Sequence, residues 1–245
     1  MNQTSIQEKL TVQIDLTTIG ISYNNEIKKP LRKETAMKRV YTLSVSLLAL
    51  ILLIGTASAM AGNQAEIPNA DLPVLITSCG QSPGATMIKV IFMRMKLKSE
   101  PKPYEINELA TAEDLKTKKE AGSPYKSIII VMGASLKGMG AAGISIDDEL
   151  ARTSKLIEEA RRQGITVIGA HIEGMKRRAQ GATVGDNTDE LSIDCVAPNS
   201  DLLVIIKEGN ADNRFTIIAK AKSIPMIEAE KILDLMIEFE KIFKK

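Results

Sequence analysis

SIIIVM, residues 127–132, is a continuous run of β-branched and apolar residues with no alternation of polar and apolar positions. Such a run predicts a strand that is buried on both faces, as in a parallel sheet with helices on both sides. Working outward from it, we predict further strands at LPVLIT, ITVIG and LLVII, and weaker ones at 104–109 and 224–227; the first three are residues 72–77, 165–169 and 202–206.

Helix signals separate these strands. Ser82-Pro83 is typical of an N-cap and first helical residue, and Ser145 with Asp148 resembles a capping box. Further helices are predicted at residues 111–120, 146–163, 188–197, 213–221 and 228–243. Alternating strands and helices predict an α/β fold, a Rossmann-like three-layer sandwich with a mostly parallel sheet of about six strands. We assign it to a single domain over residues 72–245, with a linker at 62–71.

Residues 37–61 carry the pattern of a secretory signal peptide. A basic start, Met37-Lys38-Arg39, precedes an uncharged run at 43–55 and then the small residues of Thr56 to Ala61. The run is shorter than the roughly twenty residues that span a bilayer as a helix, which favours cleavage over an uncleaved anchor. The expected location is therefore extracellular or in the cell envelope, in the periplasm or on the outer face of the cytoplasmic membrane. Membrane contact is expected only through an uncleaved signal.

The segment before this signal, residues 1–36, is polar and lacks a clear period. Lys33-Glu34 can be encoded by AAGGAG, a bacterial ribosome-binding sequence, at a normal spacing before an ATG for Met37. We interpret residues 1–36 as untranslated or, if translated, as a disordered extension.

Removal of residues 1–61 changes the charge. This segment holds seven of the 32 basic and four of the 30 acidic residues, which leaves a formal charge of −1. A nucleic-acid binder would carry a basic face and usually aromatic residues, whereas aromatic residues make up 3% of this chain. We therefore expect no nucleic-acid partner. The sequence does not specify an oligomeric state.

The loops after the predicted strands are rich in glycine, helix starts and cations. In a parallel sheet, ligands bind at the carboxyl ends of the strands, so these loops predict a site for a small anionic ligand. The predicted ligand-binding residues are Ser78, Gly80, Gln81, Ser82, Gly84, Ser135, Lys137, Gly138, Gly140, Glu173, Lys176, Arg177 and Asp186.

Residues 138–143, GMGAAG, match the G-x-G-x-x-G pattern of dinucleotide sites. The motif begins several residues beyond the preceding strand, and nicotinamide cofactors are not generally supplied outside the membrane. We therefore do not expect NAD, and no other cofactor is indicated. Two other interpretations are open: a flexible glycine loop over the sheet edge, or free amides at 138–143 that hold an anion together with Lys137.

Cys79 and Cys195 are the two cysteines, and His171 is the single histidine. Cys79 and His171 both follow predicted strands, so they are candidates for a nucleophile–base pair, with Glu173 or Asp186 orienting the base. A disulfide between the cysteines is the other interpretation in an oxidising compartment. The acidic residues near 186–194 are typical of a helix start, so no metal site is expected.

Three motifs resemble an uncharacterised family of exported bacterial proteins, a domain of unknown function (DUF6305-like). They are SCGQSPG at 78–84, GASLKGMG at 133–140, and GDNTDE at 185–190 followed by APNSD at 197–201. The resemblance covers nearly all of the chain after the signal. It implies an α/β fold and an exported location, and it brings no known activity or site.

The sequence therefore supports three hypotheses. The preferred one is an exported α/β domain that binds a small anionic ligand at the carboxyl edge of its sheet. The second is a hydrolase or transferase that depends on Cys79 and His171. The third is a protein-interaction module of the envelope.

Overall fold

The computed structural model describes residues 67–95, 97, 102–179 and 187–243. The predicted signal peptide, the extension before it and the site residue Asp186 lie outside these ranges. Six strands run through the described part: β1 (Val74–Cys79), β2 (Tyr104–Ile106), β3 (Ser127–Met132), β4 (Thr166–His171), β5 (Leu202–Ile206) and β6 (Met226–Ala229). Its α-helices are α2 (Gly84–Met95), α3 (Ala112–Glu120), α4 (Leu136–Ala142), α5 (Ile146–Gln163), α6 (Thr188–Val196), α7 (Arg214–Lys222) and α8 (Asp234–Ile242).

The strands form one parallel sheet in the order β2-β1-β3-β4-β5-β6. The predicted α/β fold with about six parallel strands is confirmed. The chain moves outward from β1 to β2 and then returns past β1 to β3, so the direction of strand addition reverses between β1 and β3. In doubly wound sheets this reversal is the point at which ligands bind.

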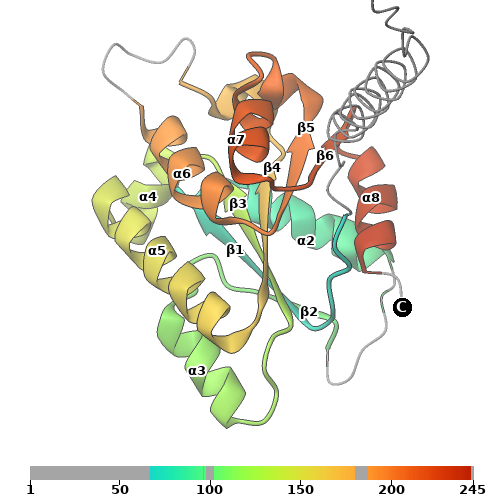
Figure 1. The fold of residues 1–245 in the computed structure, drawn as a ribbon. Helices are drawn as coiled ribbons and strands as arrows, with labels where there is room; N and C mark the ends of the chain where they lie inside the picture. Colours follow the sequence, from blue (N-terminus) through green and yellow to red (C-terminus); the bar gives the residue numbers. More distant parts are fainter. Residues whose placement is uncertain (1–66, 96, 98–101, 180–186, 244–245) are drawn as a thin grey trace, which may run out of the picture. The chain divides into compact units, whose positions relative to one another are not determined.

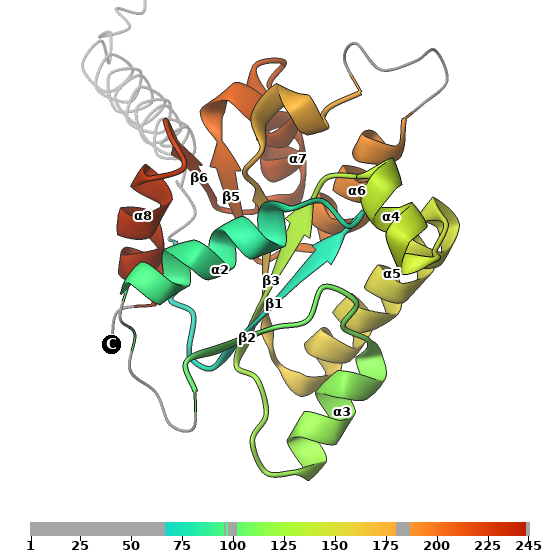
Figure 2. The same cartoon turned by 180° about the vertical axis from the view of Figure 1, so that it is seen from behind.

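Two helix layers cover the sheet (Figures 1 and 2). Helices α2 and α8 pack on one face, where Ile88, Phe92 and Phe239 join the buried side chains of the strands. Helices α3, α5, α6 and α7 cover the other face, where Leu156 and Phe215 are fully buried. All six residues of β3 are buried, as the unbroken apolar run predicts for a central strand.

Local caps explain where several helices begin. Thr111 and Asp114 form a capping box at α3, and Ser145 and Asp148 form one at α5. The side chain of each cap accepts a hydrogen bond from a backbone N–H that has no partner within the helix. Helix α5 then ends at Gly164, which adopts the left-handed conformation expected of a glycine C-cap.

Helix α4 corrects the interpretation of residues 138–143 as a flexible loop or as a set of free amides. Ser135 caps α4 by accepting from Gly138 N, Met139 packs into the interior, and Gly143 ends the helix in the left-handed region. Two glycines of the motif therefore lie inside a helix and the third terminates it. A capped helix forms because Ser135 supplies the acceptor and Met139 the buried contact. These residues do not form the strand-to-helix turn of a dinucleotide site.

Some predicted boundaries also shift. Strand β2 ends at Ile106 rather than at 109, because Asn107 opens a turn in which its carbonyl accepts from Ala110 N. Strand β6 begins at Met226 and continues to Ala229, so α8 starts at Asp234 rather than near 228. The predicted start of this helix near residue 228 was wrong because helical periodicity does not reveal that residues 226–229 pair with β5.

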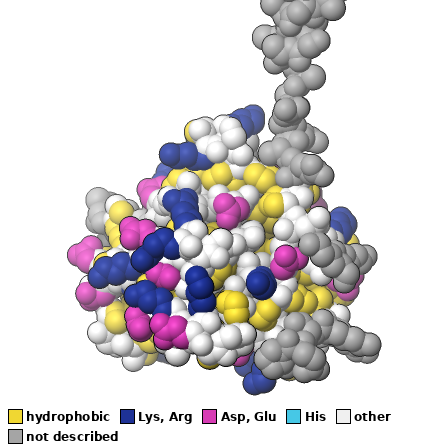
Figure 3. All heavy atoms as spheres, turned by 60° about the horizontal axis from the view of Figure 1, so that its bottom comes forward, with side chains coloured by type: hydrophobic (Ala, Val, Ile, Leu, Met, Phe, Trp, Pro, Cys, Tyr) yellow, Lys and Arg dark blue, Asp and Glu magenta, His cyan; other side chains and the backbone are white. Residues whose placement is uncertain are grey.

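Charged side chains of both signs are interspersed on the face of the molecule that Figure 3 shows. On helix α3 the two signs are instead separated along the axis, with Glu113 and Asp114 in the first turn and Lys118 and Lys119 in the last, as the helix dipole favours. Within the described ranges, no helix combines the length and the apolar character needed to cross a membrane.

Candidate functional site

The loops that leave β1 and β3 are joined to each other at the reversal point. Ser135 N donates to Gly80 O at 2.7 Å, and Gln81 and Ala134 form an isolated antiparallel bridge. Gly80 has a φ of 105°, and a Cβ added there would lie 2.5 Å from Gly133 O. The glycine at position 80 is therefore needed because the two backbones approach too closely for any side chain.

A buried ion pair from α5 holds this junction. The Glu149 side chain is fully buried, and its carboxylate accepts from Gly80 N at 2.9 Å and from Gln81 Nε2 at 2.8 Å. Arg152 donates to both oxygens of Glu149 at 2.9 Å and also to Ser78 O and Ala110 O. Sequence reasoning missed this pair. The available signal was the buried stripe of Thr153, Leu156, Ile157 and Ala160, which Glu149 extends by one turn.

Ala134, at the exit of β3, is held from two sides. Its N–H donates to Asp189 Oδ1 at 2.6 Å, and its carbonyl accepts from Arg177 Nη1 at 3.0 Å. Arg177 also donates to Glu173 Oε1 at 3.2 Å. The predicted residues Glu173 and Arg177 therefore lie together and reach the reversal point from the segment after β4.

Glu173 Oε2 is the unusual atom of this group. It is buried, and it has no hydrogen-bond partner among the described residues. A Cβ added at Gly84 would lie 3.0 Å from it, so the carboxylate approaches the amino end of α2. The positive end of a helix dipole stabilises a carboxylate there, but a buried oxygen without a donor still costs free energy.

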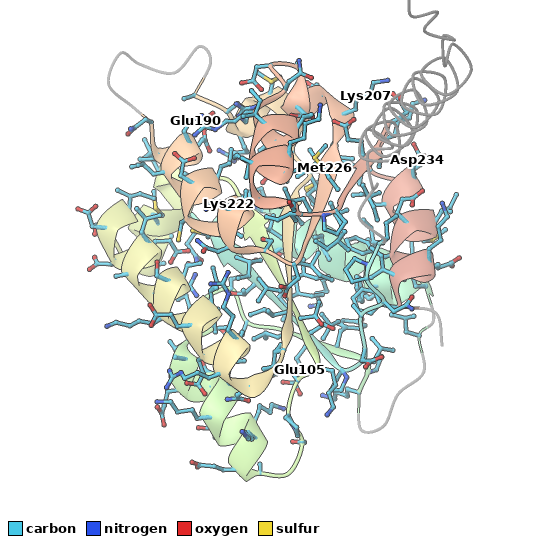
Figure 4. All side chains as sticks on the ribbon, viewed as in Figure 1. Glu105, Glu190, Lys207, Lys222, Met226 and Asp234 are labelled. Carbon is cyan, nitrogen blue, oxygen red and sulfur yellow. The ribbon has the colours of Figure 1, made fainter. Side chains whose placement is uncertain are left out.

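Arg178 organises a further cluster beside the end of β5. It is buried, donates to Glu190 Oε1 at 2.7 Å and to Asp212 Oδ2 at 2.6 Å, and lies over the Phe215 ring. Glu190 extends from the amino end of α6 (Figure 4) and also accepts from Ala179 N. Burial alone would raise the pKa of Glu190, but its hydrogen bonds with Arg178 and Ala179 bring that pKa below its usual value.

These contacts change the predicted chemistry of the strand-end loops. The amides of Gly80, Ala134 and Ala179 donate to carboxylates of the chain itself, and Gly138 N donates to Ser135. Of the glycine amides predicted to hold an anion, that of Gly80 therefore donates to Glu149 and that of Gly138 to the Ser135 cap. Two of these contacts depend on the tertiary structure, because Glu149 and Asp189 come from helices distant in sequence from Gly80 and Ala134.

Other predicted ligand residues are spread over the same edge. Ser78 and Ser82 are buried, and the Ser78 hydroxyl donates to Glu108 O at 3.3 Å. Lys137 and Lys176 are exposed on α4 and on the 3₁₀ turn at Gly174–Arg177, respectively. Gly140 is exposed on α4, with nothing near its Cβ position. The described residues contain no group of three or more acidic, cysteine or histidine side chains placed to hold a metal ion.

His171 is a core residue. Its ring is fully buried against Phe215, with Nδ1 3.1 Å from Met132 O and Nε2 3.1 Å from Gly174 O. Burial lowers the pKa of His171, which favours the neutral ring. A neutral imidazole has one N–H, so it can donate to one of these two carbonyls but not to both.

Cys79 does not meet His171. In the register of the sheet, Cys79 pairs with Met132 on β3, and His171 lies beyond Met132 on β4. Two strand spacings separate the backbones of Cys79 and His171 by about 9.5 Å. Cys79 instead lies in the buried apolar cluster that Cys195 packs against, and Cys195 and Thr153 both affect its pKa. The structure thus leaves the predicted nucleophile and base without the contact that their pairing requires.

A cavity of about 380 Å³ opens between α2 and the segments that follow β4, β5 and β6. Small-molecule sites usually fall between about 300 and 1,000 Å³. The lining contains three acidic, two basic and several apolar residues: Glu173, Glu208, Glu230, Lys176, Lys231, Met87, Ile172, Gly174, Ile206 and Ile232. The cavity therefore combines both signs of charge with apolar side chains, and Glu173 is among its lining residues.

Comparison with known proteins identifies the family of this chain but no activity. A family model described as "Domain of unknown function (DUF6305)" matches residues 71–243. No curated protein matches the chain. Among solved structures, the chain is similar to the crystal structure of an acetyl xylan esterase, AlAXEase, at 11% identity and a TM-score of 0.32. That alignment covers 69% of this chain and 82% of the other, and at this level it supports no inference about activity.

Proposed function

We propose that this chain, which belongs to the family Domain of unknown function (DUF6305), binds a small zwitterionic ligand at the carboxyl edge of its sheet. The site is the cavity beside Glu173, between α2 and the ends of β4, β5 and β6. The observation that carries the proposal is the buried Glu173 Oε2, which lacks a hydrogen-bond donor within the described structure. A buried acceptor without a partner is uncommon in native proteins and calls for an explanation, which a donor group of a bound ligand would supply.

The charges of the cavity define the ligand class. An ammonium or hydroxyl group of the ligand would donate to Glu173, while Lys176 and Lys231 would meet an acidic group. The proposed ligand thus has an acidic group, like the small anion predicted from the sequence, and carries a hydrogen-bond donor in addition. A simple anion would leave Glu173 Oε2 unsatisfied and would also approach the carboxylates of Glu208 and Glu230, which disfavours it.

The cavity also has room for an apolar part of the ligand. Met87 and Ile232 line it and at the same time line an apolar groove of about 430 Å³ between α2 and α8. The other groove residues are Val90, Ile91, Arg94, Leu233 and Met236. A zwitterion with an aliphatic side chain is therefore expected to bind more tightly than glycine, because it buries additional apolar surface.

Ligand-induced thermal shifts test this proposal. The panel compares glycine, aliphatic amino acids and aminophosphonates with phosphate, simple carboxylates and alkylamines. A ligand at 100 times its Kd stabilises by about 2.7 kcal/mol, or roughly 5–10 °C for a domain of this size. Aliphatic zwitterions should give the largest shifts. No response to any zwitterion, or a larger response to simple anions, would refute the ligand class.

Glu173→Gln then assigns the site by calorimetric titration. Loss of a charge-assisted hydrogen bond of about 1.5–3 kcal/mol should raise the Kd by roughly 10–100-fold. Glu158→Gln is the matched control, because Glu158 is exposed on α5 in the opposite helix layer. Equal affinity in the Glu173→Gln variant and the wild type would place the ligand elsewhere.

We further propose that the domain works outside the cytoplasm, after removal of residues 37–61. The order of basic, apolar and small residues in that segment supports this location. Mass spectrometry of the amino terminus of the native protein tests it. A mature start just after Ala61 is expected, and recovery of peptides from residues 1–36 would refute the start at Met37.

A further inference from the structure

The fold brings the two cysteines together. Cys79 ends β1 and Cys195 lies on α6, which packs over the face of the sheet that contains Cys79. Cys79 belongs to the buried apolar cluster on that face, Cys195 packs against the same cluster, and each thiol affects the pKa of the other. Sequence reasoning left this pairing open, because it could not tell which face of the sheet α6 covers.

The two thiols differ in their access to solvent. Cys79 is fully buried, with Thr153 as a further neighbour. Cys195 is partly exposed, and its sulfur lies 3.5 Å from Ser154 Oγ and 3.8 Å from Leu150 O. A reagent in solution can therefore reach Cys195, whereas Cys79 reacts through its neighbour.

The two thiols also differ in pKa. The hydrogen bond with Cys79 lowers the pKa of Cys195 to about 7 against the opposing effect of burial, helped by Ser154 and the charge of Arg152. The same hydrogen bond, followed by burial, raises the pKa of Cys79. Cys195 is thus the thiolate of the pair near neutral pH, and a thiolate is the form that attacks a disulfide.

We propose that Cys79 and Cys195 form an internal disulfide, made by exchange with an external disulfide through Cys195. The Cys195 thiolate attacks a low-molecular-weight disulfide RSSR, which forms a mixed disulfide at Cys195 and releases one thiolate. Cys79 then loses its proton and attacks the sulfur of Cys195, which releases the second thiol. In total, two protein thiols and RSSR give one protein disulfide and two RSH, so the external disulfide takes up both electrons and both protons.

This bond would link the exit of β1 to α6. The exit of β1 already contacts Glu149 through Gly80 N, so the disulfide adds a covalent link beside the buried ion pair at the reversal point. Because positions 79 and 195 are far apart in the sequence, closing that loop constrains the unfolded chain strongly. The expected consequence is a large dependence of thermal stability on redox state.

Thiol counting with oxidised glutathione as RSSR tests the proposal. The folded protein is reduced, exposed to oxidised glutathione, unfolded and labelled with a maleimide. No label and a cross-linked peptide that joins Cys79 to Cys195 are expected, with a melting temperature roughly 5–10 °C above that of the reduced protein. Two labelled thiols after oxidation, a persistent glutathione adduct or a bond between two chains would each overturn the proposal.

Single variants check the order of the exchange. Cys79→Ser should retain glutathione on Cys195, because the thiol that resolves the mixed disulfide is absent. Cys195→Ser should leave Cys79 unmodified in the folded protein and abolish the redox dependence of melting. Modification of Cys79 at the wild-type rate in this variant would contradict the assignment of Cys195 as the point of entry. If either variant fails to fold, thiol counting on the wild type decides alone.

Discussion

Glu149→Gln offers a direct test of how the reversal point is held together. The substitution keeps the size of the side chain but removes the charge that pairs with Arg152. The Arg152 side chain is 13% exposed, so its guanidinium would remain largely buried without a counter-charge. Removing one partner of a buried ion pair costs about 3–5 kcal/mol, and we expect a loss of that size in the free energy of unfolding.

Urea denaturation followed by circular dichroism measures this loss, with an unchanged slope indicating that the same surface unfolds. Glu113→Gln is the matched control, because its ion pair with Lys116 is exposed and should be worth less than about 1 kcal/mol. The double variant Glu149→Leu/Arg152→Met removes both charges but also removes the partners of Gly80 N and Ser78 O, so it should recover only part of the stability. A loss below about 1 kcal/mol for Glu149→Gln would refute the role given to this pair.

Two further predictions concern Gly80 and His171. Gly80→Ala should lower the free energy of unfolding by at least about 2 kcal/mol, because the φ of Gly80 is 105° and an added Cβ would meet Gly133 O. Gly140→Ala is the control, because position 140 on α4 has open space; it should leave the free energy of unfolding unchanged or raise it by up to about 1 kcal/mol. Equal denaturation midpoints for the two variants would contradict this. Burial lowers the pKa of His171 in the folded state, and the charge of Arg178 adds to this effect, while the two carbonyls and Glu173 oppose it. As the pH falls, the unfolded chain therefore takes up the proton first. The free energy of unfolding should therefore be at its full value above about pH 6.5 and fall by up to about 1.4 kcal/mol per pH unit below it. The His171→Gln variant should show no such decline between about pH 7.5 and 5.5. Parallel profiles of unfolding free energy against pH for the variant and the wild type would rule out His171 as the source.

The carboxyl edge shows where local reasoning succeeds. Glu173 and Arg177 were predicted as site residues because they follow a strand, and the parallel sheet does bring them to the reversal point beside Ala134. Strand ends can be placed from apolar runs, and in a parallel sheet all of them meet at one edge. The cavity residues Glu208 and Glu230 also follow strands, so the same rule was available for them.

Local reasoning fails where a partner arrives from elsewhere in the chain. Nothing near Gly80 or Ala134 in the sequence indicates that Glu149 and Asp189 occupy their amides. The same holds for Cys79, whose neighbour depends on which face α6 covers. Helix α4 was missed for a different reason. Glycine at 138 and 140 lowers the helix propensity of this segment, whereas packing of Met139 into the interior stabilises the helix.

The sequence by itself determined the alternation of strands and helices, the parallel sheet, the capping box of Ser145 and Asp148 and the signal pattern at residues 37–61, because each depends on residues close together in the chain. Tertiary structure alone decided the strand order, the separation of Cys79 from His171 and the placement of Cys79 and Cys195 in one apolar cluster. It also decided that Glu149 accepts from the amide of Gly80, and that Glu173 Oε2 has no donor among the described residues. These outcomes depend on which distant groups share a low-dielectric interior, where each buried polar atom needs a partner that local sequence does not specify.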